Sequence, residues 1–175
     1  MSESIAIANT ADHRDDFLAA MSRLASSVSV VTSDGVAGRV GLTVSAMTSV
    51  SADTPRPSLL ICLNEAVFAT DKILQNGVFC VNVLNQEQHF VSDVFAGRYK
   101  EIQDRFECGE WDDGVLGCPR LIEATTSLEC EIFNHQKVGS HYVIFGEVAE
   151  INFGKNAQSL VYADRSYQVA QPLND

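Results

Sequence analysis

The chain has 175 residues and a mass of 19.1 kDa, and 46% of its residues are apolar, which suits one globular domain with a buried core. Its formal net charge of −11 argues against nucleic acid or an anionic membrane surface as a partner, because both bind clusters of lysine and arginine. No segment approaches the roughly 18 consecutive apolar residues of a membrane span, so we expect no membrane contact.

The N-terminal residues are polar and acidic. They lack the basic-then-apolar order of a signal peptide, which indicates a cytoplasmic protein. We expect residues 1–14 to form a flexible segment and residues 15–175 to form a single domain. Its first predicted element is a helix over 15–24, where apolar residues recur at helical spacing, and a β-branched strand over 27–32 follows.

The next stretch, residues 41–51, has the Thr/Val content of a strand, and we expect one strand over 42–50 that pairs back as a hairpin. One face of it carries mostly small, hydroxylated side chains, namely Thr43, Ser45, Met47, Ser49 and Ser51. Such a face lets a flat polar ligand lie close to the backbone and accept hydrogen bonds. The sequence leaves open that this is only the hydrated face of an edge strand.

The remaining elements are expected in the following order. They are a fully apolar strand over 58–63 of the kind buried on both faces, a helical turn over 70–75, a strand over 78–84, a helix over 86–95, long strands over 121–133 and 141–153, and short strands over 160–162 and 167–169. Residues 98–120 form a charged, glycine-rich excursion, and a loop of this length is often functional.

Strands that follow one another with turn-length gaps indicate antiparallel pairing. The sequence therefore predicts a mainly β fold with a few short helices, arranged as a closed or nearly closed antiparallel barrel. There is no βαβ alternation and no GxGxxG motif, which disfavours a dinucleotide-binding parallel sheet.

No residue pattern establishes a catalytic group of the protein's own. The five cysteines lie at least ten residues apart, which excludes CxxC redox and zinc spacing, and the four histidines show no metal-binding spacing. Glu129 and Glu131 share one strand face, which is more typical of a hydrated surface than of an acid/base pair. Any chemistry would therefore come from a bound cofactor and not from a metal.

Four blocks of sequence together resemble a known family. They are residues 41–51, Phe79-Cys80-Val81-Asn82-Val83-Leu84, Phe95-Ala96-Gly97, and Gly139-Ser140-His141 with Gly146-Glu147-Val148. In order and spacing they resemble the motifs of the flavin reductase-like family, whose members adopt the FMN-binding split β-barrel. Over residues 17–167 the chain is most similar to the reductase components of two-component flavin monooxygenases, such as that of 4-hydroxyphenylacetate 3-monooxygenase.

The resemblance implies a set of flavin-binding residues. They are Asp34 and Gly35 on a turn, Thr43, Ser45, Ala46, Met47 and Ser49 along the hydroxyl-rich stretch, Asn64, Val81 and Asn82 on another strand, and Phe95, Ala96 and Gly97 near the phosphate or adenine end. It places His141 beside the nicotinamide as the candidate catalytic residue. Judged without the resemblance, Asn82 could equally be a polar strand end, Gly97 a helix stop and His141 a solvated hairpin residue.

One position departs from the family pattern. Many members carry a basic residue and serines after the asparagine that matches Asn64, whereas this chain has Glu65 followed by alanine and valine. A carboxylate repels a flavin phosphate. The departure therefore implies weak, reversible flavin binding, or a phosphate held elsewhere by Arg39, Arg98 or Arg105.

The activity implied by the resemblance is an NAD(P)H:flavin oxidoreductase that passes hydride to FMN or FAD and supplies reduced flavin to a partner oxygenase. The lack of an Arg/Lys cluster for a 2′-phosphate favours NADH over NADPH, whereas FMN and FAD are not separated. We expect a homodimer, because Val143, Phe145 and Val148 on the long hairpin need cover. The alternative is a non-catalytic flavin-binding protein for storage or sensing; oxidation of a pyridoxamine-type substrate is disfavoured, since basic residues for a substrate phosphate are missing.

Overall fold

The computed structural model describes residues 10–173, so the expected flexible segment over 1–14 lies mostly outside the described residues. The helices are α1 (Thr10–Ser22), α2 (Phe68–Asn76) and α3 (His89–Phe95), with short 3-10 turns η1 (Gln86–Gln88) and η2 (Arg105–Glu107). The strands are β1 (Ser26–Ser27), β2 (Ser29–Ser33), β3 (Val40–Val44), β4 (Met47–Ser51), β5 (Ser58–Asn64), β6 (Val78–Val83), β7 (Trp111–Asp113), β8 (Pro119–Leu121), β9 (Thr126–Val138), β10 (His141–Phe153), β11 (Leu160–Ala163) and β12 (Ser166–Val169).

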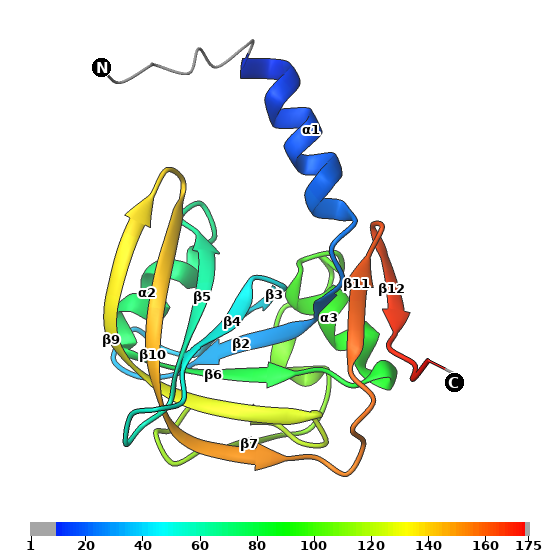
Figure 1. The fold of residues 1–175 in the computed structure, drawn as a ribbon. Helices are drawn as coiled ribbons and strands as arrows, with labels where there is room; N and C mark the ends of the chain where they lie inside the picture. Colours follow the sequence, from blue (N-terminus) through cyan, green and yellow to red (C-terminus); the bar gives the residue numbers. More distant parts are fainter. Residues whose placement is uncertain (1–9, 174–175) are drawn as a thin grey trace, which may run out of the picture.

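Seven strands form one antiparallel sheet in the order β3-β2-β6-β9-β10-β5-β4 (Figure 1). Its two edge strands, β3 and β4, are consecutive in the sequence and are joined only by Ser45 and Ala46. The sheet must therefore curl until its edges meet, and the N–H of Cys62 on β5 donates to the carbonyl of Ala46 at this corner (3.0 Å). The predicted mainly β, antiparallel barrel is confirmed.

The single strand expected over 42–50 is instead two strands with different partners. β3 pairs with β2 and β4 pairs with β5, so the chain turns a corner between them. The small polar side chains consequently do not share one face: Thr43 faces α3, Met47 packs against the barrel core and Ser49 is exposed.

Two other expectations differ in detail. The first helix, expected over 15–24, begins at Thr10, and its Phe17 and Met21 remain 60% and 45% exposed because the helix projects away from the barrel (Figure 1). Strand β5 buries alternate residues fully and the others partly, because only one of its faces lies on the barrel core. In the described part of the chain, no helix has the length and apolar character needed to cross a membrane.

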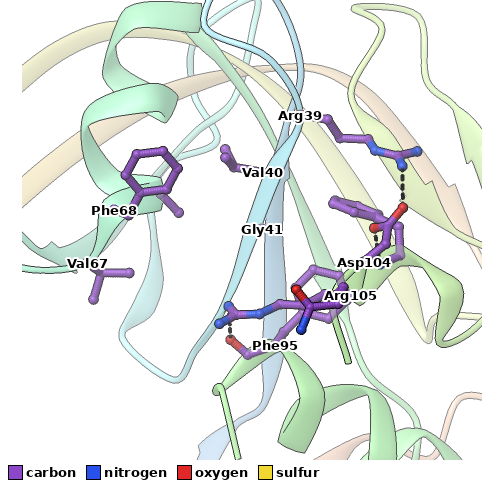
Figure 2. Close-up of a pocket in the computed structure, with 11 residues that line it drawn as sticks. Arg39, Val40, Gly41, Val67, Phe68, Phe95, Asp104 and Arg105 are labelled. Carbon is purple, nitrogen blue, oxygen red and sulfur yellow. Dashed lines mark hydrogen bonds and ion pairs between the residues drawn. The ribbon is translucent and has the colours of Figure 1, made fainter. Parts of the chain in front are cut away.

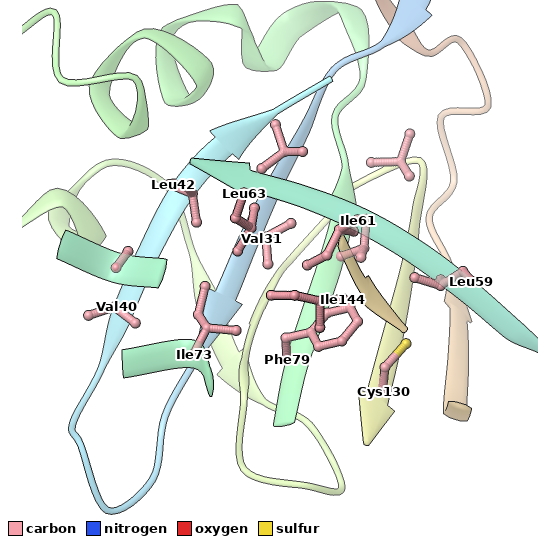
Figure 3. Packing of buried hydrophobic residues seen from close by; sticks show 14 of the residues in the cluster. Val31, Val40, Leu42, Leu59, Ile61, Leu63, Ile73, Phe79, Cys130 and Ile144 are labelled. Carbon is pink, nitrogen blue, oxygen red and sulfur yellow. The ribbon is translucent and has the colours of Figure 1, made fainter. Parts of the chain in front are cut away.

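The barrel interior is filled by aliphatic side chains around Phe79 (Figure 3). Helix α2 places Ile73 against one end of this core, and β10 contributes Ile144. Glycine is required at Gly146, because a Cβ there would lie 2.5 Å from the Phe79 ring. A second apolar cluster lies outside the barrel, where α3, the excursion over 98–120 and the β11–β12 hairpin meet.

The cysteines are part of this packing. All five are free, and all but Cys62 are buried. Burial raises the pKa of Cys118 and of Cys130 to about 12, so both remain protonated and unreactive at neutral pH. The predicted structural role of the cysteines fits their burial.

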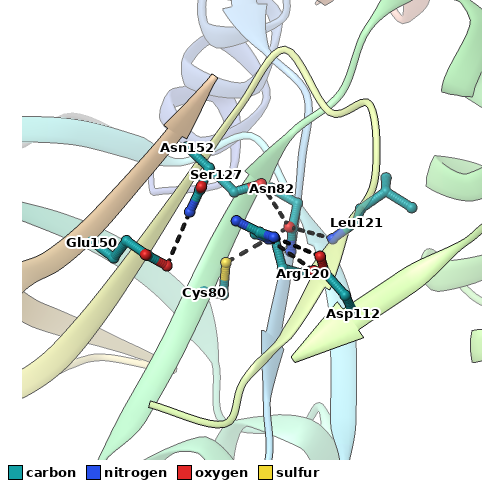
Figure 4. Close-up of polar contacts among 8 residues, drawn as sticks. All are labelled: Cys80, Asn82, Asp112, Arg120, Leu121, Ser127, Glu150 and Asn152. Carbon is teal, nitrogen blue, oxygen red and sulfur yellow. Dashed lines mark hydrogen bonds and ion pairs between the residues drawn. The ribbon is translucent and has the colours of Figure 1, made fainter. Parts of the chain in front are cut away.

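A buried amide ties the excursion to the barrel (Figure 4). The Asn82 side chain on β6 is inaccessible to solvent, and its Nδ2 donates to the carbonyl of Val30 and to Thr32 Oγ1, both at 3.1 Å. Its Oδ1 accepts hydrogen bonds from the Leu121 N–H (2.8 Å) and from Ser127 Oγ (3.0 Å). One side chain therefore joins β2, β6, β8 and β9.

Replacing Asn82 with alanine should lower the free energy of unfolding by about 3 kcal/mol, because it leaves several buried partners without a hydrogen bond. Equilibrium unfolding in urea measures the change. Ser49→Ala, at an exposed position on β4, is the control and should change stability by less than about 0.5 kcal/mol. A similar small change for Asn82→Ala would contradict the role given to the amide.

Candidate functional site

The outer face of β3 is the floor of the candidate site. Val40, Leu42 and Val44 point into the barrel core, so Gly41 and Thr43 face outward beneath α3. Thr43 Oγ1 donates to the carbonyl of Ser92 (2.6 Å), and a Cβ on Gly41 would lie 2.5 Å from the Phe95 ring. Helix α3 can therefore pack this closely only because residue 41 has no side chain.

A cleft of about 450 Å³ opens at one end of this floor (Figure 2). We call it the arginine cleft; it is lined by Arg39, Val40, Gly41, Val67, Phe68, Ala69, Phe95, Gln103, Asp104, Arg105 and Phe106. Its size falls within the range of small-ligand sites. It is assembled from β3, the start of α2, the end of α3 and the excursion over 98–120, which are distant in the sequence.

Aromatic rings form one wall of the arginine cleft. Phe95, Phe106 and Trp111 pack mutually, with ring centroids 5.1–5.4 Å apart and tilted or edge-to-face geometry. Phe68 lines the cleft from α2 and is 75% exposed. Such a site offers both a rigid apolar wall and an accessible aromatic ring to a flat ligand.

The charges in the arginine cleft do not cancel. The Arg39 guanidinium lies 3.1 Å from Asp104 Oδ2 and stacks over the Phe106 ring, 4.4 Å from its centroid. Arg105 donates to the carbonyl of Phe95 (3.2 Å) and has no carboxylate within 4.0 Å among the described residues. Two arginines against one aspartate leave one positive charge, which suits an anionic group on the ligand.

A second, smaller cavity of about 240 Å³ lies further along the same strand. We call it the serine pocket; its lining residues are Val28, Thr43, Ser45, Ser92, Ala96, Arg98, Tyr162 and Tyr167. Tyr167 Oη donates to Asp93 Oδ1 (2.6 Å), which also binds Arg98 (2.7 Å). Burial, together with the Asp93 carboxylate, raises the pKa of the Tyr167 hydroxyl. This contact holds the β11–β12 hairpin against α3.

Several of the expected flavin-binding residues come together here. Thr43, Ser45 and Ala96 line the serine pocket, and Phe95 lines the arginine cleft. Gly97 ends α3 with φ of 76°, and a Cβ there would lie 3.3 Å from an Arg105 nitrogen. Ala46 is exposed at the corner between β3 and β4.

The structure places the other expected residues elsewhere. Asp34 and Gly35 form the turn at the opposite end of the β2–β3 hairpin from Ser45. Val81 and Asn82 have no accessible surface, which corrects the expectation that they touch a flavin: Val81 fills the barrel core, and the Asn82 amide is used by its interior partners. Met47 and Ser49 are separated from Thr43 by the corner described above.

His141 begins β10 and pairs in the ladder with Asn64, the last residue of β5. Its Nδ1 lies 3.1 Å from Ser140 Oγ, and its side chain is exposed without lining either cavity. Asn64 Oδ1 accepts the N–H of Ala66 (2.9 Å) and so shapes the turn that leads to the cleft residues Val67 and Phe68. His141 thus lies at the side of the site where β5 ends.

Sequence reasoning missed several lining residues: Val67, Phe68, Gln103, Asp104, Phe106, Tyr162 and Tyr167. The length and charge of the excursion did point to residues 103–106 as a functional loop. Phe68 is exposed and Phe79 is fully buried, yet both have apolar neighbours in the sequence. Nothing local therefore distinguishes them.

Comparison with known proteins gives a consistent result. The family model described as flavin reductase like domain matches residues 21–171. The FMN reductase (NADH) RutF of Pseudomonas syringae pv. syringae B728a is 40% identical over 86% of this chain and 83% of its own length. Two solved structures, each 25% identical, are also similar. They are the NADH:FAD oxidoreductase SgcE6 of Streptomyces globisporus C-1027 with NAD and FAD fragments (TM-score 0.83; 94% of this chain and 96% of that one), and BorF, the flavin reductase component of a bacterial two-component tryptophan halogenase (TM-score 0.81; 91% and 99%).

Proposed function

The chain belongs to the flavin reductase like domain family, and on that basis we propose that it is an NADH-dependent flavin reductase. The structural observation that carries the proposal is the arginine cleft, which combines an aromatic wall with an unbalanced guanidinium on the floor formed by β3. The relatives named as FMN reductase (NADH) and as NADH:FAD oxidoreductase support the same reaction.

The residues of the cleft fit a flavin. The Phe68 ring, 75% exposed, suits contact with the tricyclic ring, and Arg39 and Arg105 suit the phosphate of FMN or FAD. When bound, the flavin accepts the hydride that reduced nicotinamide gives up. FMN and FAD are both retained as substrates, since one relative is named for each.

The protein's own residues position the flavin and the nicotinamide and do not transfer a proton. The titratable residues that line the cleft are Arg39, Asp104 and Arg105, and Asp104 is engaged by Arg39. Hydride transfer needs no protein acid or base, so alignment of the two rings is the contribution required. His141 is our candidate for aligning the nicotinamide from the side where β5 ends.

The preference for NADH over NADPH is supported by the relatives, which are named FMN reductase (NADH) and NADH:FAD oxidoreductase. The charges of the serine pocket agree with it. Its one arginine, Arg98, is paired with Asp93. No unbalanced positive charge is therefore offered there to the 2′-phosphate that distinguishes NADPH.

The reduced flavin is proposed to leave for a partner oxygenase. BorF is described as the reductase component of a two-component system, which supports such a partner in general. Glu65, at the position where the family resemblance implied a basic residue, forms an ion pair with Lys137 and does not contribute to a phosphate grip. Reversible binding, with a dissociation constant of about micromolar order, suits release of the product.

The activity is tested by steady-state oxidation of NADH and NADPH with added FMN, FAD and riboflavin. We expect flavin-dependent oxidation of NADH, a lower kcat/KM with NADPH, and little oxidation without flavin. Tight flavin binding with no NADH oxidation would instead indicate a storage or sensor protein.

Replacing His141 with alanine should lower the rate of flavin reduction, or raise the KM for NADH, by about 5- to 150-fold, because one alignment contact is lost. Flavin affinity should stay within about twofold. His135→Ala, another exposed histidine of the same hairpin, is the matched control and should leave both quantities unchanged. Loss of flavin with unchanged NADH kinetics at saturating flavin would place His141 on the other side of the ring.

We further propose that the chain is a homodimer joined through the β9–β10 hairpin. Phe133 is 54% exposed and packs on Phe145, with ring centroids 6.0 Å apart, on the outer face of the hairpin beside Val143. An apolar patch of this kind favours burial against a second copy. Val148, which was expected to need cover, is already buried in the barrel core, so it does not contribute.

Sedimentation at micromolar concentration should give about twice the 19.1 kDa of one chain. Phe133→Glu should shift the protein to monomer, because it introduces a charge into the apolar patch. Val36→Glu is the control, since Val36 is 93% exposed in the β2–β3 turn and is not part of the Phe133–Phe145 pair. A monomeric wild-type protein would contradict the proposed interface.

A further inference from the structure

Three arginines lie near the two cavities, but they are not equivalent. Arg39 is paired with Asp104, and Arg98 is paired with Asp93. Arg105 makes one hydrogen bond, to the carbonyl of Phe95, and has no carboxylate partner among the described residues. A guanidinium carries five N–H donors, so most of those on Arg105 remain available to a ligand.

Arg105 lines the arginine cleft, so the space for an anion lies on the cleft side of its guanidinium. On its other side the guanidinium packs against Gly97, in a left-handed conformation after α3, where a Cβ would lie only 3.3 Å from an Arg105 nitrogen. The guanidinium lies at the edge of the cleft, next to the aromatic wall (Figure 2). A planar ring against that wall could therefore carry its charged substituent toward Arg105.

The segment after Asn64 cannot supply the same contact. Glu65 is engaged by Lys137, and the next residues, Ala66 and Val67, have apolar side chains. Asn64 uses its own side-chain oxygen on the N–H of Ala66. Residues 64–67 therefore offer a phosphate no free cation, and the nearest cation on α2 is Lys72, whose Nζ lies 5.0 Å from the centroid of the Phe68 ring.

Resting on the proposed function, we infer that Arg105 anchors the phosphate on the ribityl chain of the flavin. The site therefore selects phosphorylated flavins, FMN or FAD, over riboflavin. Asp104 limits this selection, because it neutralises Arg39, the second guanidinium of the cleft. Arg105 supplies the direct contact, Asp104 offsets the charge of Arg39, and Lys72, 5.0 Å from the centroid of the Phe68 ring, adds a more distant positive charge.

Arg105→Met should weaken FMN binding about 10- to 100-fold and change riboflavin binding by less than about twofold, because only FMN carries the phosphate. Affinity is measured by quenching of the fluorescence of Trp111, the single tryptophan, which packs against the cleft wall. The FMN affinity of the wild type should fall with added salt, and that of riboflavin should not.

Asp104→Asn provides a test in the opposite direction. Asparagine keeps the cap on the N–H of Phe106 but removes the charge that neutralises Arg39. FMN should bind about two- to fivefold tighter, with riboflavin unchanged. Lys155→Met, at a side chain 92% exposed elsewhere on the surface, removes one positive charge, as Arg105→Met does, and is the matched control for the net charge of that variant.

The outcomes separate this inference from the proposed function. If Arg105→Met weakens FMN and riboflavin equally, or weakens neither, Arg105 is not the phosphate anchor, even when the wild type oxidises NADH with added flavin. If Arg105→Met weakens FMN and riboflavin binding equally and also lowers the melting temperature, Arg105 has a structural role instead. In that case Arg105→Lys, which retains the charge, should show no greater preference for FMN than Arg105→Met. If the wild type binds FMN through Arg105 but oxidises no NADH, the anchor stands and the reductase activity is wrong.

Discussion

The chain changes strand partner at Ser45 and Ala46, and this corner determines how the barrel closes. A seven-stranded antiparallel sheet whose edge strands are consecutive in the chain can form only if the sheet curls and the backbone changes partner within two residues. The hydrogen bond from Cys62 to Ala46 holds that change in place. Because β3 is left as an edge with one face on the core, its other face is available to α3 and to a ligand.

The arginine cleft depends on a second constraint, the attachment of the long excursion to the barrel. Residues 103–106 lie in a segment with little regular structure. They connect to the barrel through Trp111, which packs on Phe106 and pairs with Leu121 of β8, whose N–H donates to the buried Asn82. The Phe95–Phe106–Trp111 cluster then fixes the excursion against α3. A polar residue inside the barrel thus positions a binding residue that it never touches.

The chemistry explains why the site has no obvious catalytic signature. A reaction that moves a hydride between two bound ring systems asks the protein for alignment, apolar walls and a grip on charged substituents. The cleft offers rings and arginines, and its one carboxylate is already paired. In a chain with a net charge of −11, one unbalanced guanidinium is a local exception that can attract an anionic ligand without making the surface basic.

The mainly β class, the antiparallel barrel and the family could be predicted from the sequence, because strand periodicity, turn residues and the ordered motif blocks are local signals. The family resemblance implied Thr43 and Ser45 at the flavin edge and Phe95 and Ala96 at its phosphate or adenine end. The structure places the first two on or beside β3 and the other two at the end of α3, around the two cavities. Which motif residues line a cavity and which are buried in the barrel depends on the three-dimensional fold. The Asn82 amide is consumed by partners on three other strands, while Phe68 and Arg105 reach the cleft from segments that carry no motif. The physical reason is that burial, hydrogen-bond partners and ion pairs are set by residues distant in the chain, whereas a motif records only neighbours along it.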